Sequence, residues 1–380
     1  ASFVWGYAIS QLPGGVLGQR FGPRRTLMVA GLLWIIASAL TGFLPGLYFT
    51  SSLGVLGTLI AVRFLLGVAH APMFPVQAAA VQRWFPVGQW AMPNAIASTG
   101  LTLGAAVAQP LVAFIMVYWG WRMSFYVFVP VGVGLFALWW WYARDDPSEH
   151  PAMTLTELSV IKANRTALTQ NQGFDAWKQL IRNRETLLLS GAYFSQCYVF
   201  YLFFTWFFHY LVTELGFGIL ETGVLAALPW ITGAVTATLG GLACDALCKR
   251  LGSRWGCRLP AIIGLSCAGV FLYVGLYSSS PYVGVFLLSL CFAGTQFTEG
   301  AFWSAQTFVA GPYTAPACGV MNTGGNLAGI IVAPLMPFLA SYFGWAAALS
   351  TGTMVALFGA GLWLLIRADR PFQPLKRSSD

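Results

Sequence analysis

The glycine-rich stretch GGVLGQRFGPR at residues 14–24 returns later in the chain in an altered form, as GGLACDALCKRLGSR at residues 240–254. The two copies begin 226 residues apart. A second pair of landmarks, YWGW at 118–121 and YFGW at 342–345, lies 224 residues apart. Two independent matches at nearly one offset predict that the chain contains two copies of one structural unit.

Each copy is built from long apolar segments. Hydrophobic residues make up 57% of the 380 residues and charged residues only 8%, whereas soluble domains carry about 25% charged residues. The apolar runs are about 20 residues long, which suffices for a helix to cross a bilayer, and they lack the alternation of a membrane barrel. We therefore predict an all-α membrane protein. Its eleven expected spans are residues 2–18, 27–45, 54–82, 91–118, 123–142, 186–211, 221–248, 259–278, 282–309, 316–342 and 346–367.

The basic residues divide unequally between the two sides of the predicted membrane. If the helices alternate in direction, eighteen of the 20 Lys and Arg residues fall on one side; Arg63 lies inside a span, and Arg122 lies in a short turn on the other side. Basic loops remain in the cytoplasm, so we expect this side to be cytoplasmic. The net charge of +8 then needs no nucleic-acid partner. We expect a multi-pass protein of a cell membrane, a bacterial inner membrane, surrounded by lipid.

The same topology predicts that the first repeat lacks a helix. The first span must run from outside to inside, although no signal-peptide pattern precedes it. Moved back by the repeat offset, the partner of the span at 186–211 falls before residue 1. Parallel repeats are one way in which transporters are built, so we expect two pseudo-symmetric six-helix bundles with the first helix missing. The expected divisions are an N-terminal bundle at 1–142, a cytoplasmic linker at 143–185, a C-terminal bundle at 186–369 and a cytoplasmic tail at 370–380.

Several motifs, in the same order along the chain, carry a family resemblance. The stretch GGVLGQRFGPRRTL at 14–27 resembles the loop motif of the major facilitator superfamily. The anion:cation symporter branch of that family, which includes sugar-acid transporters of the galactonate type and sialin, is similar in five further stretches. These are GYAISQLPGG (6–15), RFLLGVAHAPMFP (63–75), QRWFP (82–86), GWRMSFYVFVP (120–130) and NTGGNLAGIIVAP (322–334).

The resemblance implies a function as well as a fold. It implies a substrate site at the middle of the membrane, alternating access, and proton-coupled symport of a small organic anion such as a sugar acid or carboxylate. We found no enzyme motif or nucleotide-binding motif, and we expect no enzyme activity, no cofactor and a monomer. The alternatives are an uncoupled or differently coupled carrier or an exporter, and a membrane sensor with a transporter fold.

The loop motif departs from the family at one position. In the family an aspartate at the position of Gln19 helps to latch the inward gate, so we expect a weaker latch in the first half. The second copy keeps the acid as Asp245. Alternatively, these charges are solvated loop ends. The residues at the motif positions are Gly15, Gln19, Arg20, Gly22, Arg24 and Arg25 in the first copy and Asp245 in the second.

One predicted span carries two ionisable residues. Arg63, His70 and Gln77 are spaced by seven and share a helical face. A charge at the bilayer centre costs at least about 2.5–3.5 kcal/mol, so Arg63 must face a wet cavity or a partner. Its flat guanidinium fits a carboxylate. We predict that Arg63 attracts or holds the anion, directly or through His70 and water; the alternative is a structural arginine bonded to helix-end carbonyls.

Two residues are candidates for the coupling proton. His70 stands where family members have a glutamate that carries the proton, and an ordinary histidine titrates near about pH 6.5; the alternative is a neutral hydrogen-bonding histidine. Glu299 lies close to the position that the repeat offset relates to His70, so we expect it across the cavity. A buried carboxyl group can carry a proton. Alternatively, Glu299 reaches water at a helix end or pairs with Arg63.

The remaining candidates for substrate binding are polar or aromatic residues inside the spans. Asn322 and Asn326 lie four residues apart and suit substrate hydroxyl groups, and Trp303 suits a sugar-like carbon face. The family resemblance adds four cavity positions, which are Tyr7, Gln11, Tyr198 and Tyr201.

The seven cysteines suggest no catalytic or metal site. Cys244 and Cys248 share a helical face, which would suit a metal ion, but we expect small hydrophobic side chains in a reducing compartment.

Overall fold

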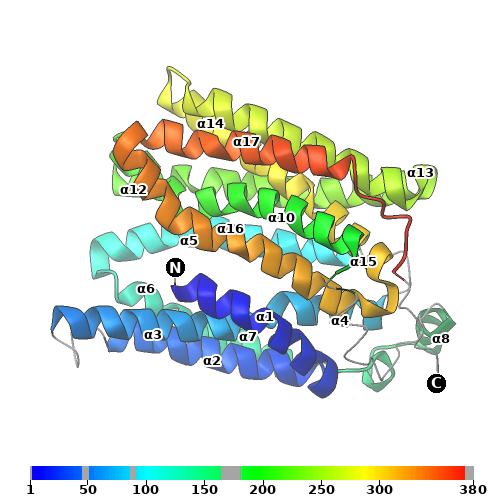
Figure 1. Cartoon of the computed structure of the whole chain (residues 1–380). Coiled ribbons are helices and arrows are strands. Elements are labelled where there is room, and N and C mark those ends of the chain that lie inside the picture. The colour runs from blue at the N-terminus through cyan, green and yellow to red at the C-terminus, as the bar shows by residue number, and fades with distance from the viewer. Residues whose placement is uncertain (1, 45–50, 86–90, 164–179, 181, 373–380) are drawn as a thin grey trace.

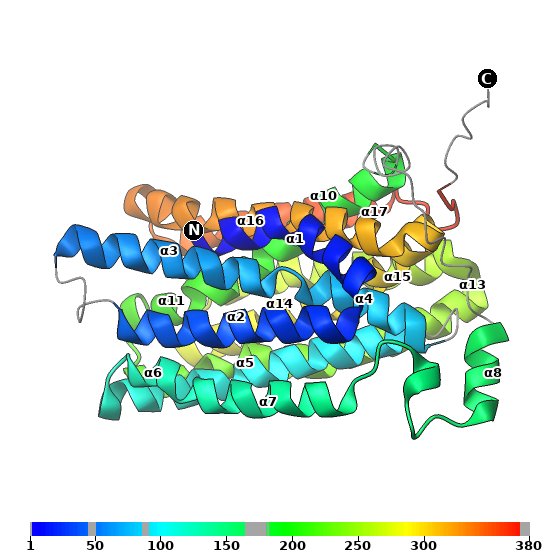
Figure 2. The same cartoon turned by 90° about the horizontal axis from the view of Figure 1, so that it is seen from below.

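The computed structural model describes residues 2–44, 51–85, 91–163, 180 and 182–372. This part of the chain contains helices and turns and no strand. Long helices run side by side in two groups (Figures 1 and 2). The first half of the chain, blue to cyan, lies in the lower part of Figure 1, and the second half, green to red, lies above it.

The helices of the first half are separated by short connections. They are α1 (Ser2–Phe21), α2 (Pro23–Phe43), α3 (Ser52–His70), α4 (Met73–Trp84), α5 (Ala91–Trp119), α6 (Met123–Tyr126) and α7 (Phe128–Tyr142).

The second half follows a segment that contains the 3₁₀ turn η1 (Pro147–Glu149) and α8 (Leu155–Ala163). Its elements are α10 (Arg184–Leu202), the π-helical turn η2 (Phe203–Phe207), α11 (Phe208–Thr213), α12 (Ile219–Leu225), α13 (Ala227–Leu276), α14 (Pro281–Phe297), α15 (Glu299–Ala310), the 3₁₀ turn η3 (Gly311–Tyr313), α16 (Thr314–Phe343) and α17 (Trp345–Trp363).

Nine helical segments of the described chain are long and apolar enough to cross a membrane. One of them, Ile219–Leu276, covers two predicted spans, because the chain reverses at Gly252, whose φ of 76° suits glycine. The remaining predicted span, 2–18, corresponds to α1, which is not among the nine. The predicted all-helical, membrane-spanning architecture is confirmed for the described residues.

The predicted domain boundaries stay a prediction. Parts of three predicted regions lie outside the described residues, namely 1, 45–50 and 86–90 in the N-terminal bundle, 164–179 and 181 in the linker, and 373–380 in the tail.

Two predicted spans contain a short break in their helical hydrogen-bond pattern. In the span 54–82 the break is at residues 71–72, between α3 and α4, and in the span 282–309 it is at Thr298, between α14 and α15. The backbone keeps helical dihedral angles at these residues, and each pair of helices forms one membrane-spanning segment. Proline lacks the backbone N–H that continues a helix, which explains the break at Pro72 and Pro75. The Thr298 hydroxyl donates to the carbonyl of residue 295 at 2.7 Å and competes with the helical ladder. The repeat offset relates the two breaks.

Glycines bring the helices of each half into close contact. A Cβ atom at Gly67 of α3 would overlap the carbonyl oxygen of Phe3 in α1, and a Cβ at Gly240 of α13 would overlap the carbonyl oxygen of Phe297 in α14. Small residues at helix interfaces are typical of membrane bundles, where close backbone approach replaces the hydrophobic effect. These two glycines therefore pack α3 against α1 and α14 against α13 directly before each break.

The two halves meet mainly along two pairs of helices. α1 contacts α16, and α5 contacts α12 and α13; α4 also contacts α16, and α5 also contacts α15. The repeat offset carries α1 onto the first part of α13 and α5 onto α16, so the two pairs are related by pseudo-symmetry. Each pair has a polar contact at its crossing: Asn322 donates to Gln11 at 2.9 Å, and the hydroxyls of Thr99 and Thr238 lie 2.8 Å apart.

Replacement of Gly240 by alanine should destabilise the second half. The new Cβ would overlap a backbone carbonyl that no side-chain rotation can move, and such overpacking costs about 1–3 kcal/mol. We expect the thermal midpoint of the protein in detergent to fall for Gly240→Ala. The matched control is Gly104→Ala in α5, where a Cβ meets nothing within 4 Å and alanine favours the helix. Equal midpoints for the two variants would contradict this account of the packing.

Candidate functional site

Glu299 is the first residue of α15, directly after the break in the predicted span. Its carboxylate accepts one hydrogen bond from Nε2 of Gln196 in α10 at 3.0 Å and another from Nε1 of Trp303 at 2.7 Å. The first turn of a helix also favours negative charge. Glu299, Gln196 and Trp303, hereafter the Glu299 group, thus hold a carboxylate in a fixed position within the bundle.

Trp303 connects the Glu299 group to the other half of the molecule. Its ring stacks on Phe74 of α4, with centroids 6.2 Å apart and planes 13° apart. Tyr193 of α10 meets the same indole edge-on at 6.0 Å. Because α4 and α15 belong to different halves, a relative movement of the halves changes the environment of the indole that donates to Glu299.

A second set of buried polar residues lies where α1 meets α16. Nδ2 of Asn322 donates to Oε1 of Gln11 at 2.9 Å, and Nδ2 of Asn326 donates to the carbonyl oxygen of Asn322 at 2.8 Å. The Tyr201 hydroxyl of α10 donates to Oδ1 of Asn326 at 2.7 Å. Nε2 of Gln11 is buried and makes no hydrogen bond of good geometry to any described residue, although Tyr7 lies beside Gln11. Gln11, Asn322, Asn326 and Tyr201, hereafter the Asn322 group, therefore include an amide donor that is available to a ligand.

The two groups adjoin through Cys197. Its Sγ donates to Oε1 of Gln196 at 3.3 Å, and a Cβ at Gly325 of α16 would lie only 2.6 Å from the same sulfur atom. Tyr7 of α1 is buried and close enough to interact with Asn322 and Gln11. The two groups therefore lie close together, where α10 packs against α16.

His70 lies at the end of α3 among aromatic rings. Its Nδ1 is 3.0 Å from the carbonyl oxygen of Leu66, so Nδ1 carries a proton and Nε2 is the atom that can gain or lose one. The imidazole meets Phe3 and Trp34 edge-on at 5.5 and 6.0 Å. The contact of Nδ1 with Leu66 is what a hydrogen-bonding histidine would make. A role in carrying a proton would use the other ring nitrogen, Nε2.

Arg63 has a different neighbour. Its guanidinium carbon lies 5.3 Å from the ring centre of Phe125, and among the described residues it forms no ion pair. The expected alternative of an ion pair with Glu299 is not what the structure has, since the carboxylate partners are Gln196 and Trp303. Seven residues correspond to about 10 Å along a helix, so Arg63 and His70 meet different neighbours although they share a face.

The family resemblance placed both Tyr198 and Tyr201 of α10 at the cavity, but the structure gives them different partners. The hydroxyl of Tyr198 is hydrogen-bonded to that of Thr351 in α17 at 2.9 Å, so Tyr198 lies outside both groups, whereas Tyr201 belongs to the Asn322 group. The sequence also did not single out Gln196 or Phe74. Gln196 is a lone amide in an apolar run, and a buried amide requires a partner, which is the signal that would have found it.

The loop motif of the first half is held by an acid outside the motif. Oδ1 of Asp145 accepts from the backbone N–H of Arg24 at 2.8 Å, at the turn where Gly22 has a φ of 87°. The Arg24 guanidinium donates to the carbonyl of Trp140 and lies 4.2 Å from its ring centre. Asp145 thus caps α2 and joins it to the end of α7, although Gln19 replaces the acid of the family motif.

The other motif residues lie toward the surface. The side chain of Gln19 is outside the described part of the structure. Arg20 and Arg25 are exposed, and Gly15 and Asp245 are partly exposed. In the second half, Nη2 of Arg258 donates to the carbonyl oxygen of Ile366 at 2.6 Å, which joins α13 to the segment after α17 much as Arg24 joins α2 to α7.

The chain is similar to known transporters over most of its length. It is 30% identical over 333 residues to the "Probable sulfoacetate transporter SauU" of Cupriavidus necator, which covers 87% of this chain and 75% of the relative. It is 30% identical over 358 residues to the "Probable galactarate/D-glucarate transporter GarP" of Escherichia coli K12, which covers 90% of this chain and 78% of the relative.

The fold agrees with these matches. A solved structure of the proton:xylose symporter XylE superposes with a TM-score of 0.74 at 15% identity, covering 96% of this chain and 85% of that chain. Residues 1–249 match the family model described as Major Facilitator Superfamily. The chain is a multi-pass membrane transporter that belongs to the major facilitator superfamily, related to the organic-anion and sugar-acid transporters that the sequence motifs resemble.

Proposed function

We propose that the protein is a secondary active transporter that carries a small organic anion, a sugar acid or carboxylate, together with protons by alternating access of its two halves. The observation that supports this most directly is the Asn322 group, a buried set of amides and a hydroxyl placed where the halves meet. Relatives named as transporters of sulfoacetate and of galactarate or D-glucarate are consistent with an oxygen-rich anionic substrate.

The Asn322 group supplies the contacts that such a substrate needs. Nε2 of Gln11 is a buried donor without a hydrogen bond to any described residue, and the asparagine amides offer both donors and acceptors for hydroxyl or carboxylate oxygens. We assign the positive charge to Arg63, because a guanidinium within a membrane bundle is stabilised by an anion. In this structure the guanidinium lies against Phe125 of α6 and is not a member of the Asn322 group. Tyr7 adds a further hydroxyl beside Gln11 and Asn322. Substrate binding and the contact between the halves thus involve the same residues.

Glu299 is the leading candidate for the proton site. As a carboxylate it accepts bonds from Gln196 and Trp303, and as a carboxylic acid it would itself become a donor. Protonation would therefore rearrange the bond to Trp303, whose ring stacks on Phe74 of the other half. Protonation and movement of the halves would be linked through this indole.

The proposal includes the setting of the transporter. We place it in a bacterial inner membrane as a monomer, with its basic loops in the cytoplasm. His70, through Nε2, is the second candidate for the proton. An uncoupled carrier or an exporter is the alternative mode of transport.

The two tyrosines of α10 allow a matched test of the substrate site. Tyr201→Phe removes the hydroxyl that donates to Asn326, whereas Tyr198→Phe removes one that interacts with Thr351. A hydrogen bond contributes about 1 kcal/mol, so we expect Tyr201→Phe to raise the KM for the transported acid about 5-fold and Tyr198→Phe to leave it unchanged. Uptake of radiolabelled galactarate, glucarate and sulfoacetate into proteoliposomes measures both. A larger effect of Tyr198→Phe would argue against this site.

The coupling site is tested by Glu299→Gln and His70→Gln. Because Glu299→Gln removes the titrating group but keeps a similar shape, we expect acid-driven uptake to fall at least about 10-fold while exchange of labelled for unlabelled substrate continues. His70→Gln should retain pH-driven uptake. A pH-sensitive dye inside the proteoliposomes and a radiolabelled acid outside follow the proton and the substrate together.

The other outcomes of this experiment are equally informative. Loss of coupling in His70→Gln alone would place the proton at Nε2 of the histidine. Substrate entry without internal acidification in the unmodified protein would contradict proton symport and would favour the uncoupled carrier.

A further inference from the structure

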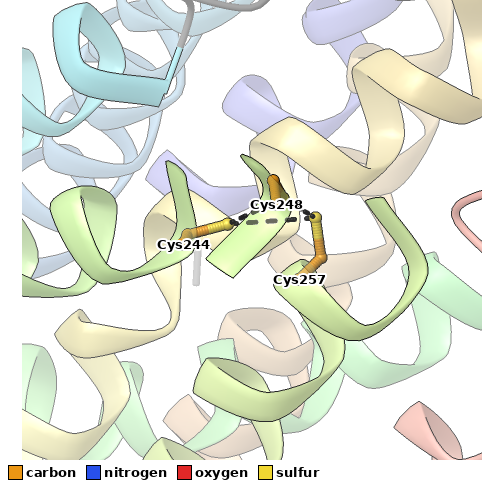
Figure 3. A group of neighbouring side chains, drawn as sticks. All are labelled: Cys244, Cys248 and Cys257. Atoms are coloured by element: carbon orange, nitrogen blue, oxygen red, sulfur yellow. Dashed lines mark hydrogen bonds between the residues drawn. The ribbon is translucent and has the colours of Figure 1, made fainter. Parts of the chain in front are cut away.

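Three of the cysteines that we expected to act as small hydrophobic residues lie together beside the reversal in the middle of α13. Cys244 and Cys248 are one helical turn apart before the reversal at Gly252, and Cys257 follows it. Their Sγ atoms are separated by 4.0 Å (244 to 248), 3.8 Å (244 to 257) and 3.7 Å (248 to 257), and the side chains point toward one another (Figure 3). All three are free thiols.

These separations match those of thiolate ligands around one metal ion. With a Zn–S distance of about 2.3 Å, two sulfur atoms of a tetrahedral site lie about 3.8 Å apart. Thiolate ligands also select Cu⁺ among transition metals. Cys244 and Cys257 are fully buried, whereas Cys248 is half-buried, so one side of the triangle is open to a fourth ligand such as water.

The close approach of the sulfur atoms depends on Gly256. A Cβ at this position would lie 2.5 Å from both the Cα and the Sγ of Cys248. Only a glycine lets the second segment of α13 come this near to the first. The residue that precedes Cys257 therefore determines whether the three thiols can meet.

The fold itself does not require sulfur at this turn. The first half makes the equivalent reversal at Gly22, whose φ of 87° corresponds to the 76° of Gly252. Alignment on these two glycines places Leu27 at the position of Cys257, and alignment on the preceding glycine pairs places Gly18 at the position of Cys244. The thiol cluster is thus particular to the second half.

The charges around the cluster suit a bound cation with three thiolates. Three thiolates and Zn²⁺ carry a net charge of −1. Lys249 and Arg250 directly follow Cys248, and Arg254 follows the reversal at Gly252, so positive side chains surround this negative site in the sequence. Binding requires deprotonated thiols, so up to three protons leave the cysteines as the metal enters.

We propose that Cys244, Cys248 and Cys257 form a binding site for a thiophilic metal ion, Zn²⁺ or Cu⁺, that joins the two helical segments of α13. The ion stabilises the reversal at Gly252 on the predicted cytoplasmic side, next to Asp245 in the second copy of the loop motif. This site is separate from the Glu299 and Asn322 groups and does not depend on the proposed transport function.

The test uses the full chain in detergent, reduced and freed of metal with a chelator. After addition of Zn²⁺, or of Cu⁺ under anaerobic conditions in a separate sample, we expect about one ion per chain by elemental analysis after gel filtration, together with a higher thermal midpoint. The two samples distinguish the metals. Cys248→Ser should lose the ion and the rise in midpoint. Cys267→Ser, which removes an exposed thiol elsewhere, should retain both.

Two further measurements keep the proposal testable if a cysteine variant folds poorly. Metal should protect Cys248 of the unmodified protein from alkylation by a maleimide, as detected by mass spectrometry. Gly256→Val, which retains all three thiols, should bind no metal. The proposal is wrong if the unmodified protein binds no more metal than the Cys244→Ser/Cys248→Ser/Cys257→Ser variant, or if Cys267→Ser reduces binding equally.

Discussion

The need to satisfy every backbone polar group inside a bilayer governs this structure. A membrane helix can be interrupted only where protein or a polar cavity surrounds the break. The breaks at residues 71–72 and at Thr298 occupy related positions in the two repeats, His70 ends the helix before one, and Glu299 begins the helix after the other. His70 and Glu299, the two candidates for the coupling proton, are thus placed where the fold already tolerates polarity.

The contact between the halves differs in kind from the packing within each half. Inside a half, glycines such as Gly67 and Gly240 bring helix backbones against each other, which fixes their relative position. Between the halves, the crossings carry polar contacts such as that of Gln11 with Asn322, and Gly223 of α12 approaches the side-chain methyl of Ala113 rather than a backbone carbonyl. A few exchangeable hydrogen bonds can be replaced by bonds to a ligand, whereas interlocked backbones cannot separate without loss of the fold. This difference suits two rigid bodies that move against each other.

The sequence predicted what depends on local pattern and on the repeat. Spans of about 20 apolar residues and a constant offset were enough to place the helices and to relate the His70 region to Glu299. The sequence did not predict contacts that depend on how one helix is rotated against another. Gln196 as the partner of Glu299, Asp145 as the cap of α2, and the approach of Cys257 to Cys244 all join residues whose spacing follows no helical period. The tyrosines of α10 are another example. Tyr198 and Tyr201 are only three residues apart, yet Tyr198 contacts α17 and Tyr201 contacts α16.

The capping of α2 by Asp145 affects how this transporter can be recombined with its relatives. The acid lies beyond α7, in the segment that leads to the second half, and it accepts from the backbone of Arg24. A hybrid protein joined directly after Tyr142 would supply the first half with foreign residues in place of its own cap. The functional first half therefore extends at least through Asp145, and the useful crossover point for exchanging halves lies further along the connecting segment than the end of the last apolar helix.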